Sequence, residues 1–114
     1  MRVRRLAGIG LLAFGIAAAG WAAPAGDAVL ADAAERRDGA LVRSLLGDGA
    51  DVNARQVDGM TALHWAVYHD DADTTKVLID AGANVKSENR YGIRPLWVAV
   101  TNGNGDIVSM LLEA

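Results

Sequence analysis

The chain has 114 residues, a formal net charge of −3 at pH 7 and no cysteine. A chain of this length forms one domain at most, and the lack of cysteine excludes disulfides, a thiolate nucleophile and a lipidated N-terminal cysteine. The excess of acidic over basic side chains disfavours binding to nucleic acid or to anionic lipid, because both attractions depend on basic residues.

Residues 1–25 predict a secretory signal peptide. Arginines occur within residues 2–5, the uncharged run Leu6–Ala19 follows, and small residues continue to Ala25. We expect cleavage after Ala25 or after Ala22, which leaves a periplasmic or secreted bacterial product without stable membrane insertion. The alternative is an uncleaved N-terminal membrane anchor, although a spanning helix needs about 20 apolar residues. Cleavage removes three arginines and no acidic residue, so the mature chain is more acidic.

Equivalent residues recur every 33 positions through the rest of the chain. A period of this length is typical of small units stacked side by side, each of which completes the core of its neighbour. Such a chain presents a surface for binding rather than a pocket for catalysis. The residues that keep the step are Leu30, Leu63 and Leu96; Ala33, Ala66 and Ala99; and Leu45, Leu78 and Leu111.

The period divides the chain into a first unit over residues 26–55, a second over 56–88 and an incomplete third over 89–114. The first unit opens with a short charged helix, and its Glu35 and Arg36 suit the polar outer face of an N-terminal capping repeat.

The second unit carries the clearest local signals. Gly59 in the Asp58–Gly59 pair predicts a tight turn with a positive φ, and Thr61 predicts the N-cap of a helix over residues 62–69. Leu63, Ala66 and Val67 would form one apolar stripe on that helix.

A second helix of the same unit is expected to begin at Asp73 or Thr74. Gly82 then suits the left-handed conformation that follows a helix. Residues 83–90 would extend away as a finger before the next turn, so each unit is expected to consist of helix, loop, helix and finger.

The third unit ends at Ala114, and Ile107–Leu112 predicts an apolar last helix. A terminal unit of a stack normally needs a polar outer face. We therefore expect either that this chain is part of a longer array or that two copies associate through the open C-terminal face.

These motifs resemble those of the ankyrin-repeat family. The resemblance implies an all-α ankyrin-repeat solenoid of stacked helix-turn-helix units with short β-hairpin fingers, and protein–protein interaction as its general role. The matching segments are Gly59–Ala66 (GMTALHWA), Gly92–Ala99 (GIRPLWVA), Leu45–Ala54 (LLGDGADVNA) and, more loosely, Leu78–Ser87.

The spacing of histidines and aspartates does not support catalysis or metal binding. The resemblance implies that His64 hydrogen-bonds near the helix start and ties neighbouring units together. His69 lies five residues further on, at the expected surface, so the two rings do not share a helix face as a metal-binding pair would. The segment Asp70–Asp73 lacks the glycine and the final glutamate of a calcium loop. We expect no enzyme activity, no metal and no cofactor.

The resemblance also assigns the variable, exposed positions to a concave groove and its finger tips. Trp65 and Trp97 are expected to pack, the latter between units, because Trp97 stands where the motif has histidine. The candidate protein-binding residues are Arg55, Val57, Asp58, Met60, Tyr68 and His69 in one unit, and Glu88, Arg90, Tyr91, Ile93, Thr101 and Asn102 in the next.

Two functions remain open from the sequence. The first is a non-catalytic scaffold of the bacterial cell envelope that binds a protein partner through the finger tips and the concave face of the inner helices. The alternative is the N-terminal recognition segment of a longer exported enzyme, toxin or effector.

Overall fold

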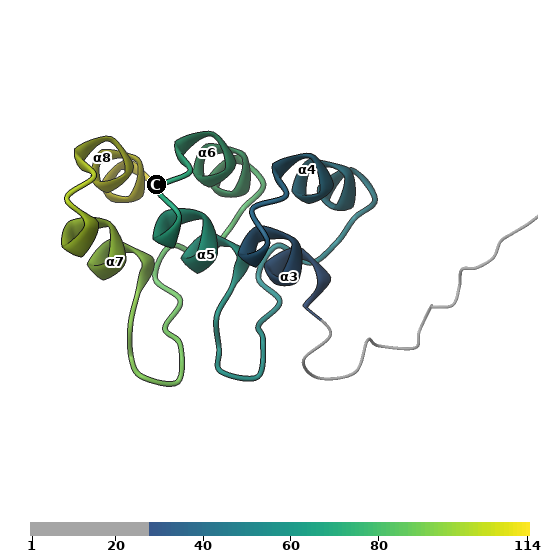
Figure 1. Cartoon of the computed structure of the whole chain (residues 1–114), viewed down its shortest axis with the longest axis horizontal. Helices are drawn as coiled ribbons and strands as arrows, with labels where there is room; N and C mark the ends of the chain where they lie inside the picture. The colour runs from purple at the N-terminus through teal and green to yellow at the C-terminus, as the bar shows by residue number, and fades with distance from the viewer. Residues whose placement is uncertain (1–27) are drawn as a thin grey trace, which may run out of the picture.

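The computed structural model describes residues 28–114, which form six α-helices in three pairs (Figure 1). The pairs are α3 (Val29–Glu35) with α4 (Gly39–Gly47), α5 (Ala62–Tyr68) with α6 (Ala72–Asp80), and α7 (Pro95–Asn102) with α8 (Gly105–Glu113). None of these described residues lies in a strand. The predicted all-α solenoid is confirmed, and the predicted signal peptide lies outside the described residues.

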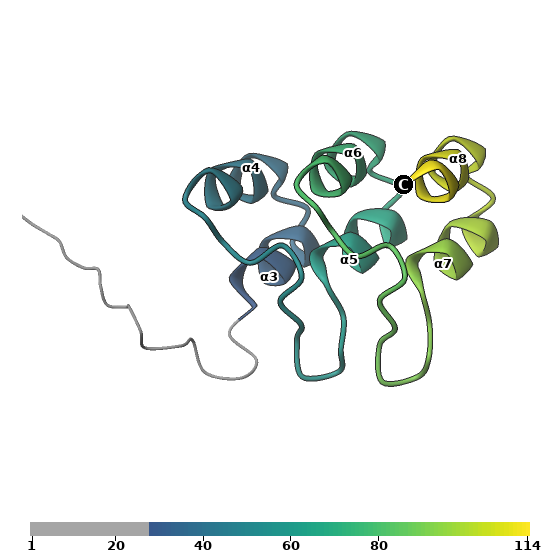
Figure 2. The same ribbon diagram turned by 180° about the vertical axis from the view of Figure 1, so that it is seen from behind.

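The helices form two rows, with two loops projecting from one side (Figures 1 and 2). The inner row holds α3, α5 and α7, and α5 packs against both of the others. The outer row holds α4, α6 and α8. The loops over residues 51–61 and 84–94, called finger 1 and finger 2, extend away from the outer row. Each tip closes as a hairpin turn, through Gln56 N–H to Met60 O at 2.9 Å and Asn89 N–H to Ile93 O at 3.1 Å.

Small side chains set the distance between the inner helices. Ala33, Ala66 and Ala99 are all buried, and they leave room for neighbouring helices to approach closely. Leu30 and Leu63 are also buried beside them. The predicted in-phase core is confirmed at these positions, whereas Leu45 and Leu96, which keep the same period, are partly buried and pack against it.

The outer helices all begin with the same kind of cap. Asp38, Asp71 and Asn104, each 33 residues apart, accept a hydrogen bond from the backbone N–H three residues further on, at 3.0 or 3.1 Å. The predicted start of the second helix at Asp73 or Thr74 is wrong. That helix begins at Ala72, because the Asp71 side chain satisfies one of its free N–H groups.

The two fingers contact each other through their backbones. Arg90 N–H donates to Asp58 O at 2.8 Å. Gly59, with φ +86°, faces finger 2 so closely that a Cβ there would lie 2.9 Å from the Cα of Asn89. Its equivalent Gly92 also has a positive φ, of +75°, but a Cβ there would meet nothing closer than 3.9 Å. A comparison of Gly59 with Gly92 therefore separates the energetic cost of a positive φ from the cost of disturbing the contact between the two fingers.

Replacing Gly59 with alanine should therefore destabilise the fold more than replacing Gly92. Gly92→Ala should lower the free energy of unfolding by about 1 kcal/mol, because alanine disfavours a positive φ. Gly59→Ala should lower it by a further amount of about 1–3 kcal/mol, because finger 2 must shift. Urea denaturation of both variants measures the difference, and equal losses would contradict close packing of the fingers.

Candidate functional site

The inner helices and fingers border two neighbouring hollows, which together we call the groove. The apolar hollow, of about 250 Å³, lies between α5, α7 and finger 2. Five of the predicted binding residues line it, and Tyr68 among them leaves 57% of its surface exposed. The lining residues are Met60, Tyr68, Asn89, Ile93, Trp97, Val98, Thr101 and Asn102.

The second hollow lies one unit earlier, between α3, α5 and finger 1. We call it the acidic hollow, because three carboxylates line its space of about 450 Å³. Two of the predicted residues, Val57 and Asp58, belong to it. Asp32, Glu35, Gln56 and Trp65 line it as well and were missed from the sequence.

A signal for the missed residues existed in the period. Asp32 and Glu35 precede Trp65 and Tyr68 by 33 residues, and Gln56 precedes Asn89 by the same step. The first unit lacks the family motif, so its inner helix was treated as a cap and not as part of the groove. Moving the predicted groove positions back by one period would have found Glu35, which precedes Tyr68, but not Asp32, Gln56 or Trp65.

Gln56 holds the acidic hollow in shape. Its Nε2 donates to Asp32 Oδ1 at 2.8 Å and to Glu35 Oε1 at 2.9 Å. Its Oε1 accepts from Trp65 Nε1 at 2.8 Å. One amide therefore orients two carboxylates and an indole ring before any partner arrives.

Aromatic side chains connect the two hollows. The Trp65 ring, which lines the acidic hollow, lies edge to face with Tyr68 of the apolar hollow, at a centroid distance of 5.6 Å. His69 completes this cluster: its ring stacks on Trp65 at a centroid distance of 5.9 Å and lies edge to face with Tyr68 at 5.3 Å, and its Nε2 lies 3.0 Å from Glu35 O. His69 is half-buried by these contacts, whereas a surface position was expected. Trp65 packs partly against the core, as predicted.

The remaining predicted residues lie on the fingers outside the two hollows. Arg55 of finger 1 donates to Glu88 O of finger 2 at 3.2 Å. Glu88 forms an ion pair with Arg94, with Oε2 and Nη2 2.9 Å apart. The Arg90 guanidinium lies 5.9 Å from the centre of the Tyr91 ring, which is 70% exposed. These side chains form a rim next to the groove.

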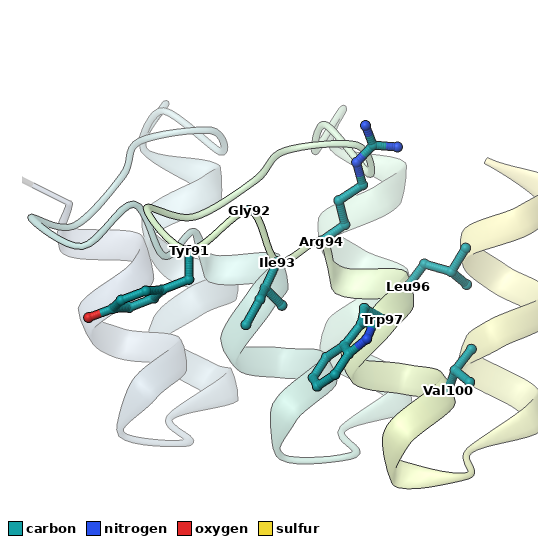
Figure 3. A pocket seen from close by; sticks show the side chains of 7 residues that line it. All are labelled: Tyr91, Gly92, Ile93, Arg94, Leu96, Trp97 and Val100. Atoms are coloured by element: carbon teal, nitrogen blue, oxygen red, sulfur yellow. The ribbon is translucent and has the colours of Figure 1, made fainter.

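The position of Trp97 corrects one expectation. Trp97 and Val100 are 59% and 60% exposed, whereas His64 and Val67, one period earlier, are fully buried. The third unit buries His64 and Val67, but within the described residues no further unit covers α7. Figure 3 shows Trp97 beside Ile93 in an open hollow on this side. Packing of Trp97 between units is therefore wrong here, and pairing of two copies through this face stays a prediction.

His64 has a structural position. Its Nε2 lies 2.8 Å from Ile93 O, so this nitrogen carries the proton, because a carbonyl only accepts. Nδ1 then accepts the backbone N–H of Thr61 at 3.2 Å, while Thr61 Oγ1 accepts His64 N–H at 3.3 Å. Burial lowers the pKa of His64 below its ordinary value; the Ile93 hydrogen bond opposes this and the charge of Arg55 adds to it. The ring is neutral, buried and fully hydrogen-bonded.

Two general features complete the description of residues 28–114. No three histidine, aspartate or glutamate side chains in this part of the chain come together as metal ligands do. None of its helices has the length and apolar character needed to cross a membrane.

The comparisons with known proteins agree with this architecture. Residues 30–114 match the family described as Ankyrin repeats (3 copies). The chain belongs to the ankyrin-repeat family. Ankyrin repeats generally mediate protein–protein interaction, and the link that His64 makes between two units is the one expected from the family motif.

The chain is similar to a small part of several longer proteins. The E3 ubiquitin-protein ligase KEG of Arabidopsis thaliana is 36% identical over 97 residues, which cover 80% of this chain and 6% of that protein. A putative ankyrin repeat protein, FPV031 of fowlpox virus, is 43% identical over 75 residues, covering 64% and 22%. The human BCL-6 corepressor-like protein 1 is 39% identical over 66 residues, covering 58% and 4%. The chain thus spans less than a quarter of each.

The burial of His64 predicts a pH dependence of stability. Because its pKa is lower in the folded than in the unfolded chain, the unfolded chain takes up the proton first as pH falls. The contribution of His64 to stability should be complete above about pH 6.5 and should decline below it. Urea unfolding of the native chain and of His64→Gln between pH 7.5 and 5.5 measures this; the native chain should show the steeper loss. Equal slopes would contradict it, and an NMR titration of His64 checks the pKa directly.

Proposed function

We propose that this protein is a non-catalytic scaffold that binds another protein in the groove formed by α3, α5, α7 and the two fingers. The observation that carries the proposal is the exposure of aromatic side chains around a preformed hollow. Tyr68, Tyr91 and Trp97 are more than half exposed, and all three lie in or beside the groove. Aromatic residues in such places are the usual anchors of protein interfaces.

The hydrogen bonds of the fingers support a rigid binding surface. Asn89 Oδ1 accepts the backbone N–H groups of Tyr91 and Ile93, at 2.9 and 3.1 Å. The Asn102 side chain donates to Tyr68 O at 3.3 Å, across two inner helices. A surface that is already ordered loses little entropy when a partner binds. The mechanism proposed is therefore shape complementarity without a cofactor.

The location of the protein in the cell is also part of the proposal. Residues 1–25 support export to the bacterial cell envelope, with a periplasmic or secreted product. The small share of each relative that the chain covers supports the second candidate, in which these repeats are the recognition segment of a longer exported enzyme, toxin or effector. Both candidates use the same groove.

Removing the anchors of the groove should abolish partner capture and leave the fold intact. The variant carries alanine at Met60, Tyr68, Arg90 and Tyr91. Because Tyr68, Arg90 and Tyr91 are exposed and Met60 is only half-buried, its melting temperature should stay close to that of the native chain. Capture of partners from periplasmic extract should weaken by at least about tenfold, the loss typical of one or more interface hot spots.

A matched control replaces exposed residues of the outer helices. Arg43, Lys76 and Ser109 of α4, α6 and α8 are exposed and lie outside both hollows. Their replacement with alanine should leave capture unchanged. Equal capture by the groove variant and by this control would remove the groove from the proposal.

Export can be tested on the N-terminus itself. We expect a bacterial host that expresses residues 1–114 to yield a periplasmic product whose intact mass corresponds to a start at Gly26 or at Ala23. The physical reason is the sequence of a basic region, an apolar run and small residues within 1–25. A membrane-bound product that retains Met1 would instead indicate the N-terminal anchor.

A further inference from the structure

We infer from the two hollows that the partner segment is an extended peptide with a basic side chain and an apolar side chain about three residues apart. The basic side chain occupies the acidic hollow and the apolar side chain the apolar hollow. This inference rests on the proposed function, since it assigns the chemistry of the partner that the groove receives.

The apolar hollow defines the first contact. Met60, Ile93 and Trp97 approach it from finger 1, finger 2 and α7, and Tyr68 closes the side toward α5. No charged side chain lines it. An aliphatic or aromatic side chain placed there would remove apolar surface from water on both partners.

Charge complementarity defines the second contact. Asp32, Glu35 and Asp58 line the acidic hollow, and no lysine or arginine does. The two ion pairs among residues 28–114, Lys76–Asp80 and Arg94–Glu88, lie elsewhere and leave these three carboxylates uncompensated.

The hydrogen bonds of the acidic hollow leave acceptors for a cation. Gln56 uses one oxygen of Asp32 and one of Glu35, and each carboxylate has a second oxygen. Asp58 Oδ1 accepts Met60 N–H at 3.1 Å, and its Oδ2 adds a third acceptor. The Trp65 ring in the same hollow attracts cations through its face. An arginine or lysine side chain matches this combination of carboxylates and indole.

The distance between successive units of the stack defines how far apart the basic and the apolar side chain lie along the peptide. The two hollows are equivalent places in successive units, because Gln56 and Asn89 line them one period apart. Neighbouring helices pack about 8–10 Å apart, and an extended chain advances about 3.3 Å per residue. An extended peptide that crosses from one hollow to the next therefore covers about three residues. The Trp65–Tyr68 contact forms the shared wall over which it passes.

The experiment is a selection of displayed random dodecapeptides on the immobilised protein. Enriched peptides should carry Arg or Lys about three positions from an aliphatic or aromatic residue. A synthetic peptide of the enriched sequence should bind at least about tenfold more weakly when its basic residue is replaced by glutamate, because the charge then repels the acidic hollow. Added salt should weaken binding of the original peptide.

Variants of the protein locate the contact. Asp32→Asn with Glu35→Gln keeps partners for Gln56 and removes two charges; it should weaken peptide binding by about threefold to tenfold. The matched control Asp48→Asn with Glu113→Gln makes the same chemical change at exposed positions away from the groove, and it should change binding by less than about twofold.

Two results would overturn the inference, and they differ in what they leave standing. If the enriched peptides are acidic or uncharged and Tyr68→Ala abolishes their binding, the groove binds protein but the partner chemistry is wrong. If no peptide is enriched, or if the enriched peptides bind Tyr68→Ala as well as the native chain, the partner chemistry and the groove itself are both wrong.

Discussion

The hydrogen bond from His64 Nε2 to Ile93 O joins α5 to finger 2. The same imidazole accepts the backbone N–H of Thr61 and so completes the cap at the start of α5. It thereby holds finger 2 against the helix of the preceding unit, with Arg90 N–H bound to Asp58 O further along the finger. Because the Ile93 side chain lines the apolar hollow, this one buried contact determines where part of the groove wall lies.

Those features that depend on neighbours in the sequence could be predicted. The period of 33 residues predicted the three stacked units. Thr61 as a cap, Gly59 in a turn and Gly82 after α6 were confirmed, since each depends on the conformation of a few adjacent residues. Most of the apolar hollow was also found, because the ankyrin resemblance assigns those positions to the groove and the finger tips.

Features that depend on contacts between units could not be predicted from local pattern. Trp97 has the same phase as His64, yet one is exposed and the other buried, because burial at this phase requires a following unit. The acidic hollow was missed because it combines α3, which lacks the motif, with Gln56 and Trp65 from the next unit. The role of Asp71 as a cap was missed as well, because it depends on where the chain reverses between α5 and α6.

The stack has one structural asymmetry with a thermodynamic consequence. Among the inner helices of residues 28–114, α5 packs against two others, whereas α3 and α7 each pack against one. In a linear array each interface adds cooperativity, so the first and last helix pairs are the first candidates for local unfolding and for fast amide hydrogen exchange. Six of the eight residues that line the apolar hollow belong to α7 and finger 2. By linkage, a ligand bound in the apolar hollow stabilises the last of these two pairs, so amide exchange protection near Trp97 reports whether the hollow is occupied.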